Sequence, residues 1–289
     1  MDNKFIIYEK NDGIATIIFN NPDKLNSWDF PTQGGMTDEF YSTLGMAEQD
    51  DEIKVIIIKG AGKSFSTGHD LNTVGYIYGM GTGKSGERRA SQRRRLQVDR
   101  GWLEDCHKRL FLCPKITIAQ VHGHCIGEGT IMMLCCDLSV AAEDAMIGHT
   151  EQRLGFAGSG IGTINILIAC IGLRRALELL ILGKQIDGIE AERIGMVNKA
   201  VPQDKLDEEV MEIAKAVTLL PRDGIAIGKT HRQLAYNSLG LTEGFTQGYV
   251  THTMFTNLRW EPDEYNFFKE RRDKGTREGF HKRDERYQK

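Results

Sequence analysis

The chain has 289 residues, of which 40% are hydrophobic and 27% are charged, and its net charge is -3. This length and composition predict a globular protein of one large domain or two smaller ones, with ample material for a buried core. They exclude an overall charge that recruits nucleic acid or an anionic membrane, and no apolar run reaches the roughly 18 residues of a membrane span.

The N-terminal stretch MDNKFIIYEKNDG is charged, which argues against a secretory signal. The six cysteines form no C-x-x-C pair and no pattern typical of a secreted disulfide framework. We therefore predict reduced core cysteines in a cytoplasmic protein. A catalytic thiol is the less favoured alternative.

The first part of the chain alternates short apolar strands with turns. Strands are predicted at 5–8 and 14–19, and the Asn-Asp-Gly turn at 11–13 favours a hairpin between them. A helix is predicted over 34–49. The strand predicted over 55–60 is a continuous apolar run, which suits a strand covered on both faces.

The segment 85–112 is predicted to be helical and is very basic. Trp102, Cys106 and Leu110 recur at helical spacing and give it one apolar face. The arginine run 93–95 could bind an anionic group such as RNA, but no aromatic residues are interleaved with the arginines. A solvated helix face is the preferred interpretation.

Further strand–turn–helix units follow. Strands are predicted at 116–121, 138–142 and 145–148, with a helix from about Gly127 and a helix–turn–helix–strand pattern over 169–201. Repeated units of this kind predict an α/β fold with parallel strands.

Beyond Pro202 the chain shows only helical patterns. They lie at 204–219, 222–238, 242–257 and 262–273. We therefore predict an α/β core over 1–202 that carries the active site, and a helical region over 203–289 for oligomerisation and pocket closure.

Two strand-to-helix turns are rich in small residues: FSTGHDL at 65–71 and GHCIGEG at 123–129. Backbone N–H groups at the start of a helix carry partial positive charge and lack partners within the helix. Two turns that converge on one oxygen would form an oxyanion hole. Two unrelated tight turns, in which glycine relieves steric strain, would leave the same pattern. No metal-ligand spacing and no P-loop or dinucleotide fingerprint is present, so we predict no metal and no organic cofactor.

These turns belong to a longer ordered pattern. FSTGHDL is followed by PKITIAQVHGHCIGEGTIMMLCCDLSVAAEDAMIG, by EQRLGFAGSGIGT and by LLILGKQIDGIEAERIGMVNKAV. From about residue 5 to residue 201 the chain resembles the enoyl-CoA hydratase/isomerase (crotonase) superfamily. The resemblance implies a crotonase-like spiral of repeated ββα units with a helical C-terminal region. It also implies an acyl-CoA thioester substrate, with coenzyme A as part of that substrate, and a homotrimer or a dimer of trimers.

The resemblance also implies roles for residues. The thioester oxygen would lie between the backbone amides of His69 and Glu128. The substrate path would be lined by residues of the two turns and of an earlier loop: Lys24, Ser66, Gly68, Asp70, Leu71, Gly127, Gly129 and Ile131.

Two positions decide the chemistry that the resemblance implies. Similar hydratases carry two glutamates, whereas here the first position is Ile131 and the second is Glu151. We expect Glu151 alone to move a proton next to the thioester, as in double-bond isomerisation. Hydration stays open, because hydratase-lyases acting on aromatic acyl-CoA esters also use one glutamate. Without the resemblance, Glu151 would be an ordinary surface acid at a strand end.

Glu128 and His69 depart from the common family pattern. Glu128 stands where family members commonly have a glycine. Its negative charge would stabilise the N-terminus of the helix, or its side chain would serve as a replacement catalytic acid or base. His69 is expected mainly as an amide donor, and a side-chain role for it would indicate an acyl-CoA decarboxylase or hydrolase instead. A non-catalytic acyl-CoA-binding relative is the alternative from another class.

Overall fold

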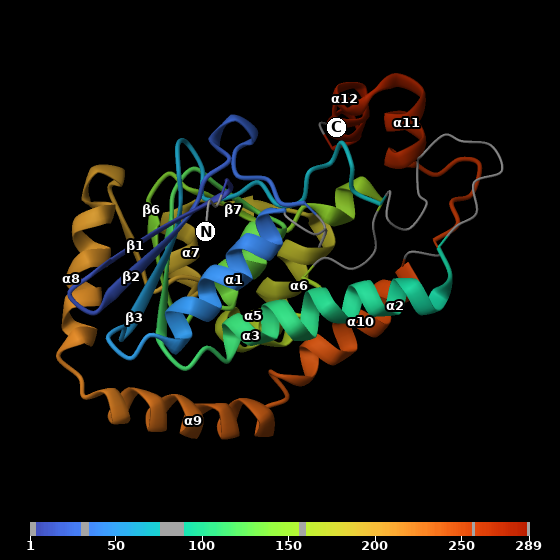
Figure 1. The fold of residues 1–289 in the computed structure, drawn as a ribbon. Helices are drawn as coiled ribbons and strands as arrows, with labels where there is room; N and C mark the ends of the chain where they lie inside the picture. Colours follow the sequence, from blue (N-terminus) through green and yellow to red (C-terminus); the bar gives the residue numbers. More distant parts are fainter. Residues whose placement is uncertain (1–3, 30–34, 76–89, 156–159, 256–257, 288–289) are drawn as a thin grey trace.

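The computed structural model describes residues 4–29, 35–75, 90–155, 160–255 and 258–287 (Figure 1). Six strands form one sheet in the order β1-β2-β3-β4-β6-β9, and three short strands form a second sheet in the order β5-β7-β8. The strands are β1 (Ile6–Asn11), β2 (Ile14–Phe19), β3 (Val55–Gly60), β4 (Ile116–Val121), β5 (His124–Ile126), β6 (Leu138–Ala142), β7 (Met146–Gly148), β8 (Gln185–Ile186) and β9 (Lys199–Val201). Only the β1–β2 and β7–β8 pairs are antiparallel among these neighbours, which confirms the predicted α/β fold.

Helices pack around both sheets, and the described elements after β9 are all helical. The α-helices are α1 (Met36–Gln49), α2 (Gln92–Arg100), α3 (Lys108–Phe111), α4 (Glu128–Leu134), α5 (Ile164–Ile171), α6 (Leu173–Leu182), α7 (Gly188–Ile194), α8 (Leu206–Thr218), α9 (Arg222–Ser238), α10 (Glu243–Phe255), α11 (Phe267–Lys274) and α12 (Thr276–Glu285). Among the residues that the structure describes, 3₁₀ turns lie at Pro22–Lys24, Glu151–Leu154 and Gln203–Lys205. None of the described helices is long and apolar enough to cross a membrane.

The predicted hairpin between the first two strands is confirmed. Asn11 pairs with Ile14, which leaves a two-residue turn of Asp12 and Gly13. Both turn residues have positive φ, 49° and 81°, as hairpin turns that match the twist of the strands require.

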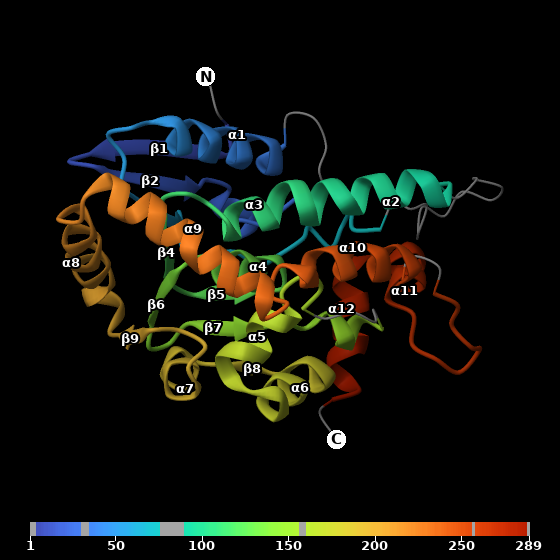
Figure 2. The ribbon, with the colours of Figure 1, turned by 90° about the horizontal axis from the view of Figure 1, so that it is seen from below.

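The core lies around the central strands of the larger sheet. Val55, Ile56, Ile57 and Ile58 of β3 are all buried, as predicted for a strand covered on both faces. Helix α1 packs against β1 and β2, and α8 packs against β2, β3, β4 and β6 (Figure 2). Cys170 departs from the prediction of core cysteines, because it is exposed on α5.

The basic helical segment is irregular in its middle. Ser91 caps α2 by accepting a hydrogen bond from the Arg94 amide at 3.2 Å. Residues Gly101–His107 then form a π-helix, here called the π segment, which continues directly into α3. Helix α10 packs alongside α2 and the π segment (Figures 1 and 2). The arginine run is not one exposed patch, because Arg95 is buried and its Nε donates to the Ala90 carbonyl.

Several boundaries differ from the prediction. The start of the basic helix predicted at residue 85 lies outside the described residues, as do residues 256 and 257 of the helix predicted over 242–257. Helix α11 begins at Phe267 rather than at residue 262, because the Asn266 side chain accepts from the Lys269 amide and caps it. Helix α12 was not predicted. The division into two regions at residue 202 stays a prediction.

Candidate active site

The two glycine-containing turns lie directly against each other. The Ser66 amide donates to the His124 carbonyl, and the Ile126 amide donates to the Ser66 carbonyl, each at 2.9 Å. Gly68 has φ +80°, and a methyl group built on it would lie 2.7 Å from the Ile126 carbonyl oxygen and 3.1 Å from the Glu128 amide nitrogen. Only glycine allows this close approach. The sequence could not show that these segments, sixty residues apart, meet at one place.

A pocket opens where the two turns meet. From the first turn it is lined by Gly68, His69 and Leu71, and from the second by Gly127, Glu128 and Ile131. Seven of the predicted site residues line it, because Glu151 lies in the same wall.

The other predicted substrate-binding residues do not line this pocket. The Ser66 hydroxyl donates to the Asn26 carbonyl and accepts from the Gly68 amide, so this side chain holds the first turn. Gly129 packs against that turn, since a methyl group on it would lie 2.7 Å from the Ser66 carbonyl oxygen. Asp70 pairs with Lys24 at 3.2 Å, and the Lys24 side chain is exposed. A role of Lys24 and Asp70 in the coenzyme A path stays a prediction.

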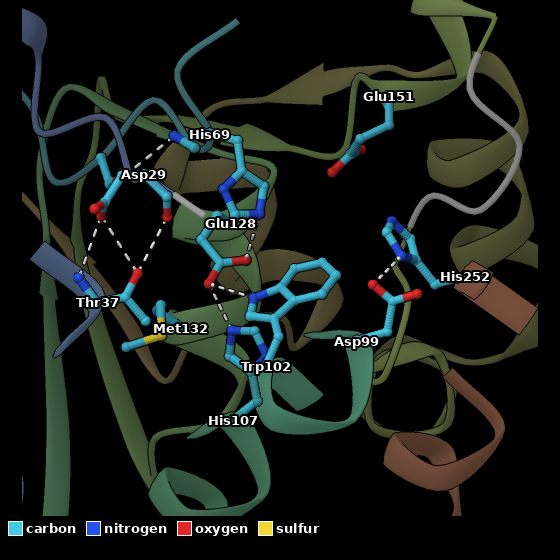
Figure 3. A network of polar contacts seen from close by, with 12 residues as sticks. Asp29, Thr37, His69, Asp99, Trp102, His107, Glu128, Met132, Glu151 and His252 are labelled. Atoms are coloured by element: carbon cyan, nitrogen blue, oxygen red, sulfur yellow. Dashed lines mark hydrogen bonds and ion pairs between the residues drawn. The ribbon is translucent and has the colours of Figure 1, made fainter. Parts of the chain in front are cut away.

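Glu151 opens the 3₁₀ turn that follows β7. Its Oε1 lies 3.5 Å from Nδ1 of the buried His149. An ideal Cβ on Gly127, whose φ is +56°, would lie 3.0 Å from the same Oε1. The Glu151 side chain extends from its strand end toward the space beside His69 and Trp102 (Figure 3). The carboxylate therefore sits next to the second turn and is not an acid facing bulk solvent alone.

Glu128 directs its side chain into a buried cluster of hydrogen-bond donors. Its Oε1 lies 2.6 Å from His107 Nε2 and accepts from Trp102 Nε1 at 3.3 Å, while its Oε2 lies 3.5 Å from His69 Nε2 (Figure 3). Burial raises the pKa of Glu128, but His107, His69 and the Trp102 N–H outweigh burial and hold this pKa below its ordinary value. Glu128 is therefore an ionised acceptor at neutral pH, and of the two alternatives left open for it, the structure shows a side chain at the pocket.

The π segment explains why Trp102 and His107 reach the same carboxylate. Residues five apart lie about 140° apart around a regular α-helix, but a π-helix hydrogen-bonds from i to i+5 and brings them to one face. Helical spacing along the sequence predicted an ordinary apolar face of Trp102, Cys106 and Leu110, and it gave no sign of the partnership between Trp102 and His107. No local signal distinguishes a π-helix from an α-helix in this stretch.

His69 carries an imidazole that stays neutral near pH 7. Its ring stacks at a tilt on Trp102, with 5.2 Å between ring centroids. Burial lowers the pKa of His69 against the opposing effect of Glu128.

A second buried acid–imidazole pair lies on the other side of Trp102. Asp99 Oδ1 lies 3.1 Å from His252 Nδ1, and the Thr253 hydroxyl donates to Asp99 Oδ2 at 2.7 Å. His252 lines the pocket from α10, and its ring centroid lies 5.2 Å from that of Trp102 (Figure 3). No sequence pattern indicates this pair, because Asp99 lies on α2 and His252 on α10, far apart along the chain.

The remaining walls are apolar. Leu154, Phe267 and Phe268 form a small hydrophobic cluster with Leu71 at the edge of the pocket. Within the described ranges, no group of histidine, cysteine and acidic residues could hold a metal ion.

Comparison with known proteins identifies the family of this chain. Residues 9–276 match the family model described as enoyl-CoA hydratase/isomerase. The chain is 31% identical to the peroxisomal Δ(3,5)-Δ(2,4)-dienoyl-CoA isomerase of Arabidopsis thaliana over 70% of each chain. An enoyl-CoA hydratase/isomerase structure from Xanthobacter autotrophicus superposes with a TM-score of 0.83 at 30% identity, covering 98% of both chains. An enoyl-CoA hydratase structure from Mycobacterium smegmatis gives a TM-score of 0.80 at 26% identity, covering 98% of this chain and 94% of that one. The protein belongs to the enoyl-CoA hydratase/isomerase family.

Proposed function

We propose that this enzyme transfers a proton next to the thioester of an enoyl-CoA, with the enolate oxygen held by two backbone amides and Glu151 as the acid/base. One observation carries the proposal: the two turns touch, and the Glu151 carboxylate borders the same pocket. The names of the relatives support an acyl-CoA substrate, since they describe an enoyl-CoA hydratase and a dienoyl-CoA isomerase.

The amides of His69 and Glu128 are the proposed oxyanion hole. Glu128 is the first residue of α4, so its amide has no acceptor one turn earlier within the helix and carries part of the helix dipole. Such donors stabilise an oxygen as it becomes negative, and losing one typically costs about 2.7–4 kcal/mol of transition-state stabilisation.

Glu151 is the proposed proton carrier. Its carboxylate would remove a proton from the carbon next to the thioester, or from the vinylogous carbon, while the double bond shifts toward the oxygen. Returning the proton to another carbon completes an isomerisation. In a hydration, the oxygen of a water bonds to the carbon β to the thioester, and Glu151 passes a proton of that water to the α carbon. The apolar side chains of Ile131, Leu154 and Phe268 keep bulk water from the enolate.

A decarboxylase or hydrolase that uses the His69 side chain is less well supported. Such an enzyme must hold a substrate carboxylate near this imidazole. Here the imidazole is neutral near pH 7, and its Nε2 lies 3.5 Å from the ionised Glu128. A substrate carboxylate at this place would be repelled by Glu128.

Exchange of the α protons of a saturated acyl-CoA with D₂O tests the proposal directly, because it needs only the oxyanion hole and the proton carrier. Glu151→Gln should lower the exchange rate by about 10²–10⁴, the usual contribution of a general acid–base group. Glu178→Gln is the matched control, since Glu178 is an exposed acid on α6 that pairs with Lys184 and does not line the pocket. Unchanged exchange in Glu151→Gln would remove Glu151 from the mechanism. Binding of acyl-CoA without exchange in the unmodified protein would favour a non-catalytic relative.

The oligomeric state and the cellular location stay predictions. A homotrimer or a dimer of trimers would cover exposed apolar side chains of α9, such as Ile227 and Leu234. Light scattering coupled to size-exclusion chromatography measures the number of subunits.

A further inference from the structure

Glu128 stands one helical turn before the position where the sequence lacks a carboxylate. Ile131 occupies that position in α4, and residues three apart lie on the same face of a helix. Both side chains line the pocket that Glu151 also borders. The pocket therefore contains two carboxylates, one of them displaced from the expected place by a helical turn.

The two oxygens of Glu128 have different surroundings. Oε1 is held by His107 and Trp102, whereas Oε2 is buried and has no hydrogen-bond partner among the described residues. His69 Nε2 lies 3.5 Å from Oε2, beyond the usual length of a hydrogen bond. A carboxylate oxygen accepts about two hydrogen bonds, and buried polar groups without a partner are rare in native proteins. This atom therefore requires a donor from inside the pocket.

We infer that Glu128 Oε2 holds the water molecule that adds to the substrate, so that the enzyme is a hydratase with Glu128 and Glu151 as its two catalytic carboxylates. This inference rests on the proposed function, because it uses the same oxyanion hole and the same proton carrier. Water fits the site better than a group of the substrate chain, since Oε2 accepts one hydrogen of a water and the other stays available for transfer.

The two acids then have different tasks. The water oxygen forms a bond to the carbon β to the thioester as the C=C π electrons move toward the carbonyl oxygen. Glu151 takes one proton from the water and delivers it to the α carbon, which gives the 3-hydroxyacyl thioester. The second hydrogen of the water remains on the new hydroxyl and stays hydrogen-bonded to Glu128. Nothing is oxidised or reduced, and Glu128 is ionised throughout.

The fixed position of Glu128 suits this task. His107 is fully buried, and Trp102 is packed between His69 and His252, so Oε1 is anchored on two sides (Figure 3). An anchored carboxylate keeps Oε2 in one place and so orients the water before the reaction. A hydrogen bond to an ionised acceptor such as this carboxylate is shorter and stronger than one to a neutral group.

Glu128→Gln tests the inference, because the amide keeps an oxygen for His107 and turns the other atom from an acceptor into a donor. Two rates are measured for each of several acyl groups: straight, branched and cyclic. The first is α-proton exchange of the saturated acyl-CoA in D₂O, and the second is hydration of the trans-2-enoyl-CoA with the same carbon skeleton. We expect the hydration rate to fall at least about 100-fold more than the exchange rate in Glu128→Gln, whereas Glu151→Gln loses both.

Asp99→Asn is the matched control, since Asp99 is an equally buried acid on the other side of Trp102 that does not line the pocket. It should keep the ratio of hydration to exchange, even where it lowers stability. Equal losses of both rates in Glu128→Gln, or unchanged hydration, would show that Glu128 serves only the fold. Glu128→Asp keeps the charge and should recover part of the hydration if the inference holds. An unmodified enzyme that exchanges α protons but hydrates none of the matching enoyl-CoA esters overturns the hydratase inference and leaves the proposed function standing.

Discussion

Gly68 is the position where one added methyl group tests the contact between the two turns. Its φ of +80° costs an L-residue about 1–2 kcal/mol. The methyl group would also lie 2.7 Å from the Ile126 carbonyl oxygen and 3.1 Å from the Glu128 amide, and both are backbone atoms that move only with their turn. Overpacking of this kind costs about 1–3 kcal/mol more. Gly68→Ala should therefore lower the free energy of unfolding by roughly 2–5 kcal/mol.

The effect on activity should exceed the effect on folding. If the turns move apart, the His69 and Glu128 amides can no longer share one oxygen, and α-proton exchange should fall about 10²–10³-fold in the protein that remains folded. Urea unfolding measures the stability, and exchange is assayed well below the unfolding midpoint. Gly240→Ala is the control: φ is +70° there as well, but no described atom lies within 4 Å of the added methyl group. Wild-type exchange in folded Gly68→Ala would refute the shared oxyanion hole.

Two further predictions concern stability. Lys229→Met should lower the free energy of unfolding by about 3–5 kcal/mol in urea, because it leaves Asp137 without the buried cation that contacts it at 2.6 and 2.7 Å. Lys59→Met, which breaks a more exposed pair, should change it by at most about 1 kcal/mol, and equal losses would contradict this reasoning. Because the pKa of His69 is lower in the folded than in the unfolded chain, the unfolded state binds the extra proton first, so stability should decline as pH falls below about 6.5. His69→Gln should weaken this decline in denaturant titrations between pH 7.5 and 5.5, and an unchanged pH dependence would show that His69 does not cause it.

Local sequence patterns predicted most strands well. The ranges 14–19, 55–60, 116–121 and 138–142 match β2, β3, β4 and β6 because each is an apolar run bounded by turn residues. β5 lies inside the second turn and has only three residues, and its pairing with β7 depends on a distant segment. Helix α12 is rich in charged residues and shows too weak an apolar stripe for its periodicity to reveal it.

The site was predictable only where its residues follow a pattern along the chain. The turns that contain Gly68 and Gly127 were identified by their small residues, and Glu151 only by the resemblance to the family. The donors around Glu128 were not, because Trp102 and His107 reach it only through the π segment. The direction of the Glu128 side chain depends on those donors. The sequence therefore left open whether Glu128 is only a charge at the helix N-terminus or also a side chain of the pocket, and the packing shows the second.

The π segment also sets how the chain can vary in length. Compared with a regular α-helix, the π segment has one extra residue in the turn between Trp102 and His107. The helices before and after it, α2 and α3, are ordinary α-helices. Deleting a single residue within 103–106 would leave the two rings four residues apart, which regular α-helical winding still brings to one face, whereas adding one residue would turn the indole away from Glu128. This stretch should therefore tolerate the loss of one residue better than the gain of one.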